Sequence, residues 1–218
     1  MQILSQCMSD KAVTVAGNGT AFLAMFQAGQ VKDGQRYIWN SGCASMGYDL
    51  PAAIGACYAA KGKDVVCLAG DGSVQMNIQE LQTVVHHNLP IKLFVLNNDG
   101  YISIKQTQDN FFGGKRVGCN STTGVSFPDV GKLASAYGLP VHIIDGQKDL
   151  VTRITDILGT PGPSVSVVEL QNDYKFSPRN SSEQKANGIL VSKPLEDLYP
   201  FLDREELRSN MIIPIIEE

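Results

Sequence analysis

Two short polar segments of the chain carry groups that suit cation chemistry, and each directly follows an apolar run. Gly70-Asp71-Gly72-Ser73 follows Val65–Ala69, and Asn97-Asn98-Asp99-Gly100 follows Ile91–Leu96. The Asp71 carboxylate, the Asn98 side-chain oxygen and the Gly100 carbonyl are hard donors suited to Mg²⁺, with diphosphate oxygens and water completing the octahedron. No lysine follows as in a phosphate-binding Walker loop, so a divalent metal would have to balance the charge of Asp71.

The pattern around these segments indicates how they come together. Between the two apolar runs, residues 77–88 place Ile78, Leu81 and Val85 at helical spacing. A strand, a helix and a second strand predict a parallel pair, whose polar ends lie at the same carboxyl edge of one sheet. Open parallel sheets bind ligands at that edge. We expect residues 72–75 to lie just before the helix, whose free main-chain amides attract phosphate.

The two segments together resemble a known signature. GDG at residues 70–72 and NN at residues 97–98 resemble the thiamine diphosphate signature of 2-oxo acid decarboxylases and acetolactate synthases, and the flanking residues look most like acetolactate synthase and its relatives. A glycine-flanked aspartate alone is more often a plain turn, but the spaced second segment favours a cofactor site. The resemblance implies that Asp71, Asn98 and Gly100 hold the metal. It also implies these cofactor contacts: Gly70, Asp71, Gly72, Ser73, Asn98, Gly100, Tyr101 and Ile102.

A further segment, SMGYDLPAAIGA, resembles the family's SMGYGLPAAIGA stretch, which grips the aminopyrimidine ring. By that resemblance, Met46 bends the cofactor into a V and the carbonyl of Ala44 accepts a hydrogen bond from its amino group. These two are the candidate catalytic residues, and Ser45 joins the cofactor contacts. Met46 by itself would be interpreted as a core residue. Asp49, where relatives carry glycine or a small residue, and Cys43-Ala44, in place of a glycine-rich pair, depart from the family pattern.

The loop after the first predicted strand offers one more contact. Gly17-Asn18-Gly19 has the start of a dinucleotide fingerprint, but the third glycine of GxGxxG would fall at Phe22. In the resembling family this loop faces the cofactor diphosphate, which makes the residues from Asn18 to Ala21 candidate contacts, Gly19 and Thr20 included. An ordinary strand-to-helix turn is the alternative. By the same resemblance, Ile104, Lys105 and Gln108 fall in the family's active-site helix, within an otherwise long polar segment after Tyr101.

Six apolar runs predict strands, and the segments between them predict helices. The strands are expected at Ala12–Ala16, Arg36–Trp39, Val65–Ala69, Ile91–Leu96, Val141–Ile144 and Ser164–Leu170. This alternation indicates an α/β fold with a doubly wound, mainly parallel six-stranded sheet and helices on both faces. The resemblance implies the thiamine diphosphate-binding fold for residues 1–170.

The composition changes at Gln171, and residues 171–218 are predicted to be a C-terminal extension. Lys175–Gly188 is polar, and we expect it to be flexible. Asp203 and Glu206 have capping-box spacing for one short helix. The apolar run Met211–Ile216 needs burial, so we expect the extension to pack on the domain or on a neighbouring subunit.

The composition and net charge limit the classes of partner and the compartment that we expect for this chain. The 218 residues carry a net charge of −4, with a pI near 5.4 and no basic cluster, which excludes nucleic acid as an expected partner. Met1–Asp10 lacks the features of a signal peptide, and no stretch is long enough to cross a membrane. The five cysteines are odd in number and lack CxxC spacing, which indicates reduced thiols in a cytoplasmic protein.

The resemblance implies that a 2-oxo acid such as pyruvate loses carbon dioxide and that the product is protonated or joined to a second carbonyl. In the family, a glutamate from a separate pyrimidine-binding domain, usually on another subunit, activates the cofactor. Here Glu80 would lie on the wrong side, so that glutamate is expected on another domain or chain. We expect a fragment or one subunit of a homo- or hetero-oligomer, inactive in isolation.

Two other functional classes are weighed against this enzyme. A non-catalytic cofactor-binding or regulatory subunit would have little reason to retain Asp71 together with Asn98. A nicotinamide-dependent oxidoreductase would require the missing GxGxxG.

Overall fold

The computed structural model describes residues 1–61 and 63–214. The chain divides into two compact units, Met1–Asn172 and a second unit from Asp173 onward. The first unit holds all the residues proposed above for chemistry.

The sheet of the first unit has six strands in the order β2-β1-β3-β4-β6-β5, and all its pairings are parallel. The predicted α/β fold class is therefore confirmed, with a sheet that is wholly parallel. The strands are β1 (Val13–Ala16), β2 (Arg36–Trp39), β3 (Val65–Gly70), β4 (Ile91–Asn97), β5 (Val141–Ile144) and β6 (Ser164–Glu169).

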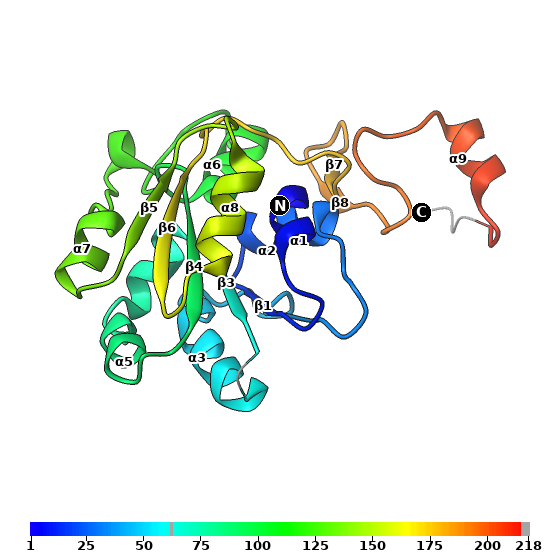
Figure 1. The fold of residues 1–218 in the computed structure, drawn as a ribbon. Helices are drawn as coiled ribbons and strands as arrows, with labels where there is room; N and C mark the ends of the chain where they lie inside the picture. Colours follow the sequence, from blue (N-terminus) through cyan, green and yellow to red (C-terminus); the bar gives the residue numbers. More distant parts are fainter. Residues whose placement is uncertain (62, 215–218) are drawn as a thin grey trace. The chain divides into compact units, whose positions relative to one another are not determined.

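Helices cover both faces of this sheet (Figure 1). One face carries α1 (Gln2–Cys7), α2 (Thr20–Ala28) and α8 (Leu150–Gly159). The other face carries α3 (Asp49–Ala60), α5 (Glu80–His86) and α7 (Val130–Ala136). Asp129 caps α7, because its side chain accepts the main-chain N–H of Lys132.

Two hydrophobic clusters hold these layers together, and alternate residues of each central strand belong to different clusters. In β3, Val65 and Cys67 pack on the α3 side, whereas Val66 and Leu68 pack on the α2 side. All four are completely buried. Burial on both faces explains the continuous apolar run, since covered parallel strands have no solvent-facing side.

The chain reverses its direction of travel across the sheet between β1 and β3. β1 is followed by α2 on one face and by β2 on one side, whereas β3 is followed by α5 on the other face and by β4 on the other side. The loops that leave the carboxyl ends of β1 and β3 therefore run to opposite faces of the sheet. Such a divergence leaves a crevice where ligands bind in open α/β sheets.

One helix boundary differs from the sequence-based expectation. The helix after β3 is broken into α4 (Asp71–Val74), the 3₁₀ turn η1 (Gln75–Asn77) and α5. It thus begins at Asp71, and residues 72–75 lie within its first turns and not before it.

The polar segment after Tyr101 begins with the helix α6 (Ile102–Phe111). Ile102 is buried and anchors its first turn. The segment that follows contains the 3₁₀ turn η2 (Ser121–Thr123), which Asn120 caps. The region is therefore more ordered than a continuous loop.

The second unit contains a hairpin that the sequence analysis missed. β7 (Ser182–Gln184) and β8 (Leu190–Ser192) pair antiparallel, and Lys185 and Gly188 close the turn between them. Lys175–Gly188 was expected to be flexible because its composition is polar. Short strands held by main-chain hydrogen bonds leave little hydrophobic signal in a sequence.

The predicted short helix of the second unit is present as α9 (Arg204–Asn210). The Asp203 side chain caps it by accepting the N–H groups of Glu205 and Glu206 at 2.8 and 3.4 Å. The predicted apolar run ends at Ile215 and Ile216, which lie outside the described residues.

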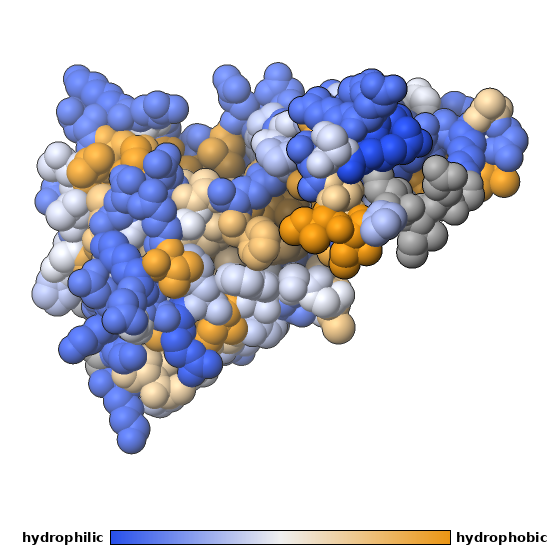
Figure 2. Space-filling view, turned by 90° about the vertical axis from the view of Figure 1, so that its right-hand side faces the viewer, coloured by the Kyte–Doolittle hydropathy of each residue, from blue (hydrophilic) through white to orange (hydrophobic). Residues whose placement is uncertain are grey.

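The surface seen in Figure 2 is largely hydrophilic, with separate patches of apolar residues. Within the described ranges, the structure has no helix of the length and apolar character needed to cross a membrane.

Candidate functional site

A cavity of about 120 Å³ opens where β1, β3 and β4 end, at the crevice described above. It brings together segments that are far apart in the sequence. Its lining consists of Asn18, Gly19, Thr20, Met46, Gly70, Asp71, Gly72, Ser73, Asn98, Gly100, Tyr101, Ile102, Ser103 and Ile104. Thirteen of these fourteen residues, all but Ser103, were named in the sequence analysis.

The carboxylate of Asp71 joins the two polar segments. Its Oδ2 accepts the main-chain N–H groups of Asn98 and Gly100 at 3.1 and 3.0 Å. Its Oδ1 accepts the N–H of Gly72 at 2.7 Å. Asp71 is only 3% exposed. These bonds hold the end of β4 against the end of β3, and they fix the orientation of the carboxylate.

Burial raises the pKa of Asp71 above its ordinary value, and the nearby charge of Asp99 adds to this effect. The three main-chain N–H donors act in the opposite direction. A bound divalent cation would favour the ionised carboxylate, because it supplies positive charge where burial has removed water.

The donor set suits a hard divalent cation. Asp71, Asn98 and Gly100 line the same cavity and offer carboxylate, amide and carbonyl oxygens, the ligand types that Mg²⁺ accepts alongside phosphate and water. Among the described residues there is no cluster of three or more histidine, cysteine, aspartate or glutamate side chains. The candidate metal site is therefore of the mixed carboxylate, amide and carbonyl kind.

Two glycines allow the close packing beneath this site. A Cβ atom on Gly72 would lie 2.4 Å from the ring of Tyr101, which packs edge-on against Phe127. A Cβ atom on Gly100, whose φ is +125°, would lie 2.2 Å from the carbonyl oxygen of Cys119. Both positions require glycine for steric reasons.

The segment expected to grip the aminopyrimidine ring is only partly in the cavity. Met46 lines it, whereas Ala44 and Ser45 are exposed and outside the lining. The carbonyl oxygen of Ala44 accepts a hydrogen bond from Nδ2 of Asn18 at 3.0 Å. Ala44 has a positive φ of 50°, which is uncommon for a residue with a Cβ atom. The cofactor contacts of Ala44 and Ser45 remain predictions.

Ser103 was missed as a site residue, whereas Thr20 belongs to the predicted diphosphate loop. Thr20 Oγ1 lies 3.5 Å from Nδ2 of Asn98, and a Cβ atom on Gly19 would lie 3.7 Å from Oγ of Ser103. Ser103 directly follows the predicted contact Ile102. Its hydroxyl group at the first turn of α6 would have been the available signal.

The first turns of α6 contribute unequally to the site. Ile104 lines the cavity. Lys105 does not, because its Nζ donates to the carbonyl of Asn172 at 2.5 Å. Gln108 exchanges hydrogen bonds with the main chain of Val117. The predicted helix is thus present, and of these three residues only Ile104 reaches the cavity.

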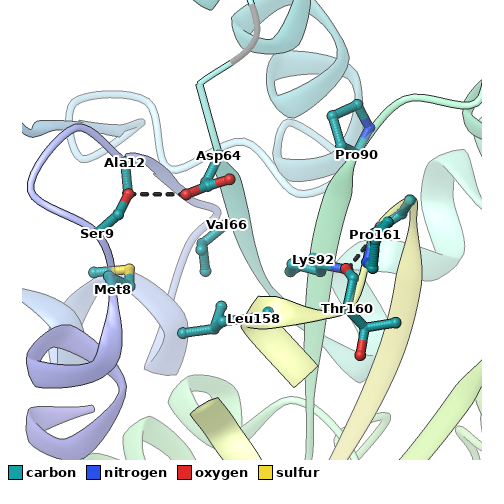
Figure 3. Close-up of a pocket in the computed structure, with 12 residues that line it drawn as sticks. Met8, Ser9, Ala12, Asp64, Val66, Pro90, Lys92, Leu158, Thr160 and Pro161 are labelled. Carbon is teal, nitrogen blue, oxygen red and sulfur yellow. Dashed lines mark hydrogen bonds between the residues drawn. The ribbon is translucent and has the colours of Figure 1, made fainter. Parts of the chain in front are cut away.

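A second cavity, of about 140 Å³, lies at the opposite edge of the sheet (Figure 3). Lys92, near the start of β4, donates from Nζ to the carbonyls of Thr160 and Gly162 at 2.5 and 2.6 Å. Burial lowers the pKa of Lys92, and the charge of Asp64 opposes that shift. Lys92 satisfies carbonyls just after α8, which is a structural role.

The sequence matches a protein-family model described as thiamine pyrophosphate enzyme, C-terminal TPP binding domain, over residues 17–168. It is 39% identical over 157 residues to an acetolactate synthase large subunit of Cyanidium caldarium, covering 71% of this chain and 26% of that protein. It is 34% identical over 167 residues to chloroplastic acetolactate synthase 2 of Brassica napus, covering 75% of this chain and 26% of that one.

Among solved structures, the fold matches a thiamine diphosphate-dependent 4-hydroxybenzoylformate decarboxylase of Rhodococcus jostii RHA1. The TM-score is 0.68 at 22% identity, covering 80% of this chain and 32% of that chain. The present chain thus spans about a quarter to a third of the length of the relatives it matches.

Proposed function

The chain belongs to the thiamine pyrophosphate enzymes, to whose C-terminal domain it corresponds, and from this premise we propose that it binds thiamine diphosphate with Mg²⁺. The observation that carries the proposal is the Asp71 carboxylate, buried in a cavity of oxygen donors and bonded to both polar segments. Asp71, Asn98 and Gly100 would hold the metal.

The remaining lining residues would bind and orient the cofactor. Gly70 offers an unobstructed main chain, since a Cβ atom there would meet nothing within 4 Å. That opening lets diphosphate oxygens approach the backbone at the start of α4. Met46 and Ile102 offer apolar contacts, which would keep water away from the rings.

The proposed reaction is decarboxylation of a 2-oxo acid such as pyruvate, with or without joining of the product to a second carbonyl compound. The names of the relatives, acetolactate synthase and a thiamine diphosphate-dependent decarboxylase, support this choice. When bound, thiamine diphosphate supplies the reactive carbon that makes loss of carbon dioxide possible, and the protein supplies binding and orientation. The part of the chain described here would hold the metal, the diphosphate and the bend of the cofactor.

The activating glutamate is proposed to come from a pyrimidine-binding domain, either in the same polypeptide or on another chain of a homo- or hetero-oligomer. Apolar side chains near the cavity support such a partner. Met76 next to Gly47 and Ile104 on the cavity wall are 53% and 43% exposed. Exposed apolar groups beside a binding site are typical of an interaction surface.

The competing proposal is a cofactor-binding or regulatory subunit without catalysis. It predicts cofactor binding but no turnover, even with a pyrimidine-binding partner present. For the compartment we propose the cytoplasm, on the basis of the free cysteines among the described residues. The relative from Brassica napus is chloroplastic, so localisation of a tagged chain would decide between the two.

Isothermal titration of the purified chain tests the binding proposal. We expect heat from thiamine diphosphate in the presence of Mg²⁺, weaker binding with a chelator present, and no binding of NADH. Equal binding with and without a divalent cation would remove the metal from the proposal. Binding of NADH in place of thiamine diphosphate would overturn it.

A further inference from the structure

A buried carboxylate that the proposed chemistry does not use lies beneath the cavity. Asp49, the first residue of α3, has no exposed surface. Its Oδ1 accepts the main-chain N–H of Leu50 at 3.0 Å, and its Oδ2 accepts a very short hydrogen bond from Oγ of Ser73. Ser73 lies two residues after Asp71 and lines the cavity. Asp49 therefore contacts a residue of the cavity wall but does not itself line the cavity.

The end of β1 is built around this carboxylate. A Cβ atom on Gly17 would lie 2.5 Å from Oδ2 of Asp49 and 3.2 Å from its Cγ. Any side chain larger than hydrogen at Gly17 would displace Asp49. The carboxylate thus sits at the junction of the β1 end, α3 and α4.

The hydrogen bond from Ser73 to Asp49 orients the hydroxyl group that also contacts Gly47. A hydroxyl group has one proton to donate and two lone pairs that accept. Ser73 donates its proton to Asp49 and accepts the main-chain N–H of Gly47 at 2.9 Å, so the bond to Asp49 fixes the orientation of the lone pair that Gly47 contacts. By accepting this hydrogen bond, Asp49 orients Ser73 so that its oxygen can accept the N–H of Gly47.

Gly47 is held from its other side as well. Its carbonyl oxygen accepts a hydrogen bond from Nδ2 of Asn77 at 2.7 Å. Its φ is +78°, and a Cβ atom there would lie 2.8 Å from that nitrogen. Both polar groups of Gly47 are thus bonded to side chains of the segment after Asp71. Met46 directly precedes this doubly held glycine.

We propose that Asp49 is a positioning residue that acts through Ser73 to hold the main chain at Gly47, and thereby sets the place of Met46 over the cofactor site. The role of Met46 in this proposal rests on the proposed function. The hydrogen-bond relay itself, from Asp49 to Ser73 to Gly47, concerns the protein without any ligand.

The electrostatic surroundings agree with a specific role for this carboxylate. Burial raises the pKa of Asp49, and the hydrogen bonds from Ser73 and from the main-chain N–H groups of Leu50 and Asp49 act against that shift. The charge of Asp49 also acts on the thiol of Cys67, whose pKa is raised by burial first and by that charge second. Burying a carboxylate costs free energy, so hydrogen bonds must offset that cost.

The rival explanation is that Asp49 only stabilises the first turn of α3 through Leu50. Hydrogen exchange of the Gly47 amide separates the two explanations, because loss of a helix-terminal bond alone would leave Gly47 protected. The measurement uses the 218-residue chain without ligand and the variants Asp49→Asn, Ser73→Ala and the double variant. Asp129→Ala, which removes the side-chain cap of α7, is the control for loss of a helix-terminal bond.

We expect Gly47 to exchange about tenfold faster in Asp49→Asn and in Ser73→Ala, the factor that corresponds to one lost hydrogen bond. The double variant should be no faster than Ser73→Ala, since residues that act through one another give non-additive effects. Exchange of the β-sheet amides of Val15 and Leu93 reports whether each variant is folded. Unchanged Gly47 exchange in Asp49→Asn, or additive effects in the double variant, would overturn the relay.

A second measurement addresses Met46 and uses two ligands with Mg²⁺, thiamine diphosphate and inorganic diphosphate. Asp49→Asn should weaken thiamine diphosphate about tenfold and leave inorganic diphosphate unchanged, because only the former reaches Met46. Equal weakening of both ligands would place the effect on the diphosphate side and contradict the proposal. If the wild-type chain bound neither ligand, the proposed function would fail, while the Gly47 exchange result would still decide the relay.

Discussion

Oδ2 of Asp71 lies 3.0 Å from the main-chain nitrogen of Gly100, which joins the ends of β3 and β4 by a hydrogen bond across 29 positions of sequence. The carboxylate is therefore in place before any metal arrives. A site assembled in this way loses little conformational freedom on binding, and such preorganisation favours affinity.

Replacing Asp71 tests the metal site. Asp71→Ala should abolish Mg²⁺-dependent binding of thiamine diphosphate, because it removes the only charged ligand proposed. It should also destabilise the fold by about 1–3 kcal/mol for each main-chain N–H left without an acceptor. Asn98→Ala removes a neutral oxygen and should weaken binding less. Calorimetry and urea unfolding measure the two effects.

Asp99→Asn is the control for Asp71→Ala, since Asp99 lies in the same loop but is exposed. It should leave the magnesium dependence of binding intact. Equal cofactor affinity in wild type and Asp71→Ala would remove Asp71 from the metal site.

Two glycines of the site should respond to alanine in opposite ways. Gly70→Ala meets no atom within 4 Å and has an ordinary extended backbone, so stability should be kept while the new methyl group obstructs the cavity. Gly100→Ala clashes with Cys119 at positive φ and should cost about 1–3 kcal/mol or more from backbone strain.

Thermal unfolding together with cofactor titration distinguishes the two glycine variants. Gly146→Ala, also without neighbours within 4 Å but away from the cavity, should change neither property. Normal cofactor affinity in Gly70→Ala would argue against diphosphate binding at the start of α4.

The pH dependence of stability should reveal Asp49. Burial raises its pKa in the folded protein above the ordinary value of 3.8, so the folded state binds this proton more tightly than the unfolded state. The resulting stabilisation is complete below the unfolded pKa and is lost as pH rises through the raised folded pKa. The free energy of unfolding of the wild type should therefore fall over this window relative to Asp49→Asn.

Urea unfolding of the chain without ligand, at steps of pH from about 4 to 7, measures this difference between wild type and Asp49→Asn. Parallel curves for the two proteins across that range would show that Asp49 does not titrate with a raised pKa.

Met46 should matter more for turnover than for affinity. In the enzyme assembled with a pyrimidine-binding partner, Met46→Ala should lower kcat by a larger factor than it lowers cofactor affinity. Most of the free energy of cofactor binding should survive, because the diphosphate and metal contacts lie elsewhere, whereas the reactive geometry loosens. A Met46→Ala variant that is less stable but turns over normally would support the core-packing interpretation.

The isolated chain should not be a competent enzyme. We expect it to release no more carbon dioxide from pyruvate than free thiamine diphosphate does, because the activating glutamate is proposed on another domain. Adding a pyrimidine-binding domain, in the same polypeptide or as a separate chain, should restore turnover. Substantial decarboxylation by the 218 residues alone would mean that one of their own groups replaces that glutamate.

Much of the fold could be predicted because strands buried on both faces produce continuous apolar runs. Val65–Ala69 and Ile91–Leu96 were recognised in this way, and both are central strands. The hairpin of β7 and β8 was missed, since its residues are mostly polar and its pairing depends on main-chain bonds. The early start of the helix at Asp71 was missed because the apolar residues at helical spacing, Ile78, Leu81 and Val85, all lie after η1.

By itself, the sequence determined which polar segments end the central strands, and therefore where oxygen donors such as Asp71 and Asn98 would gather. Only the tertiary structure decided that Asp71 binds the main chain of Gly100, that Asn18 bonds to Ala44, and that Ser73 and Asn77 hold Gly47. The physical reason is the separation along the chain of the residues that interact. Periodicity and strand ends are local properties of a chain, whereas these hydrogen bonds join segments 26 to 30 residues apart, whose proximity depends on strand order and helix breaks.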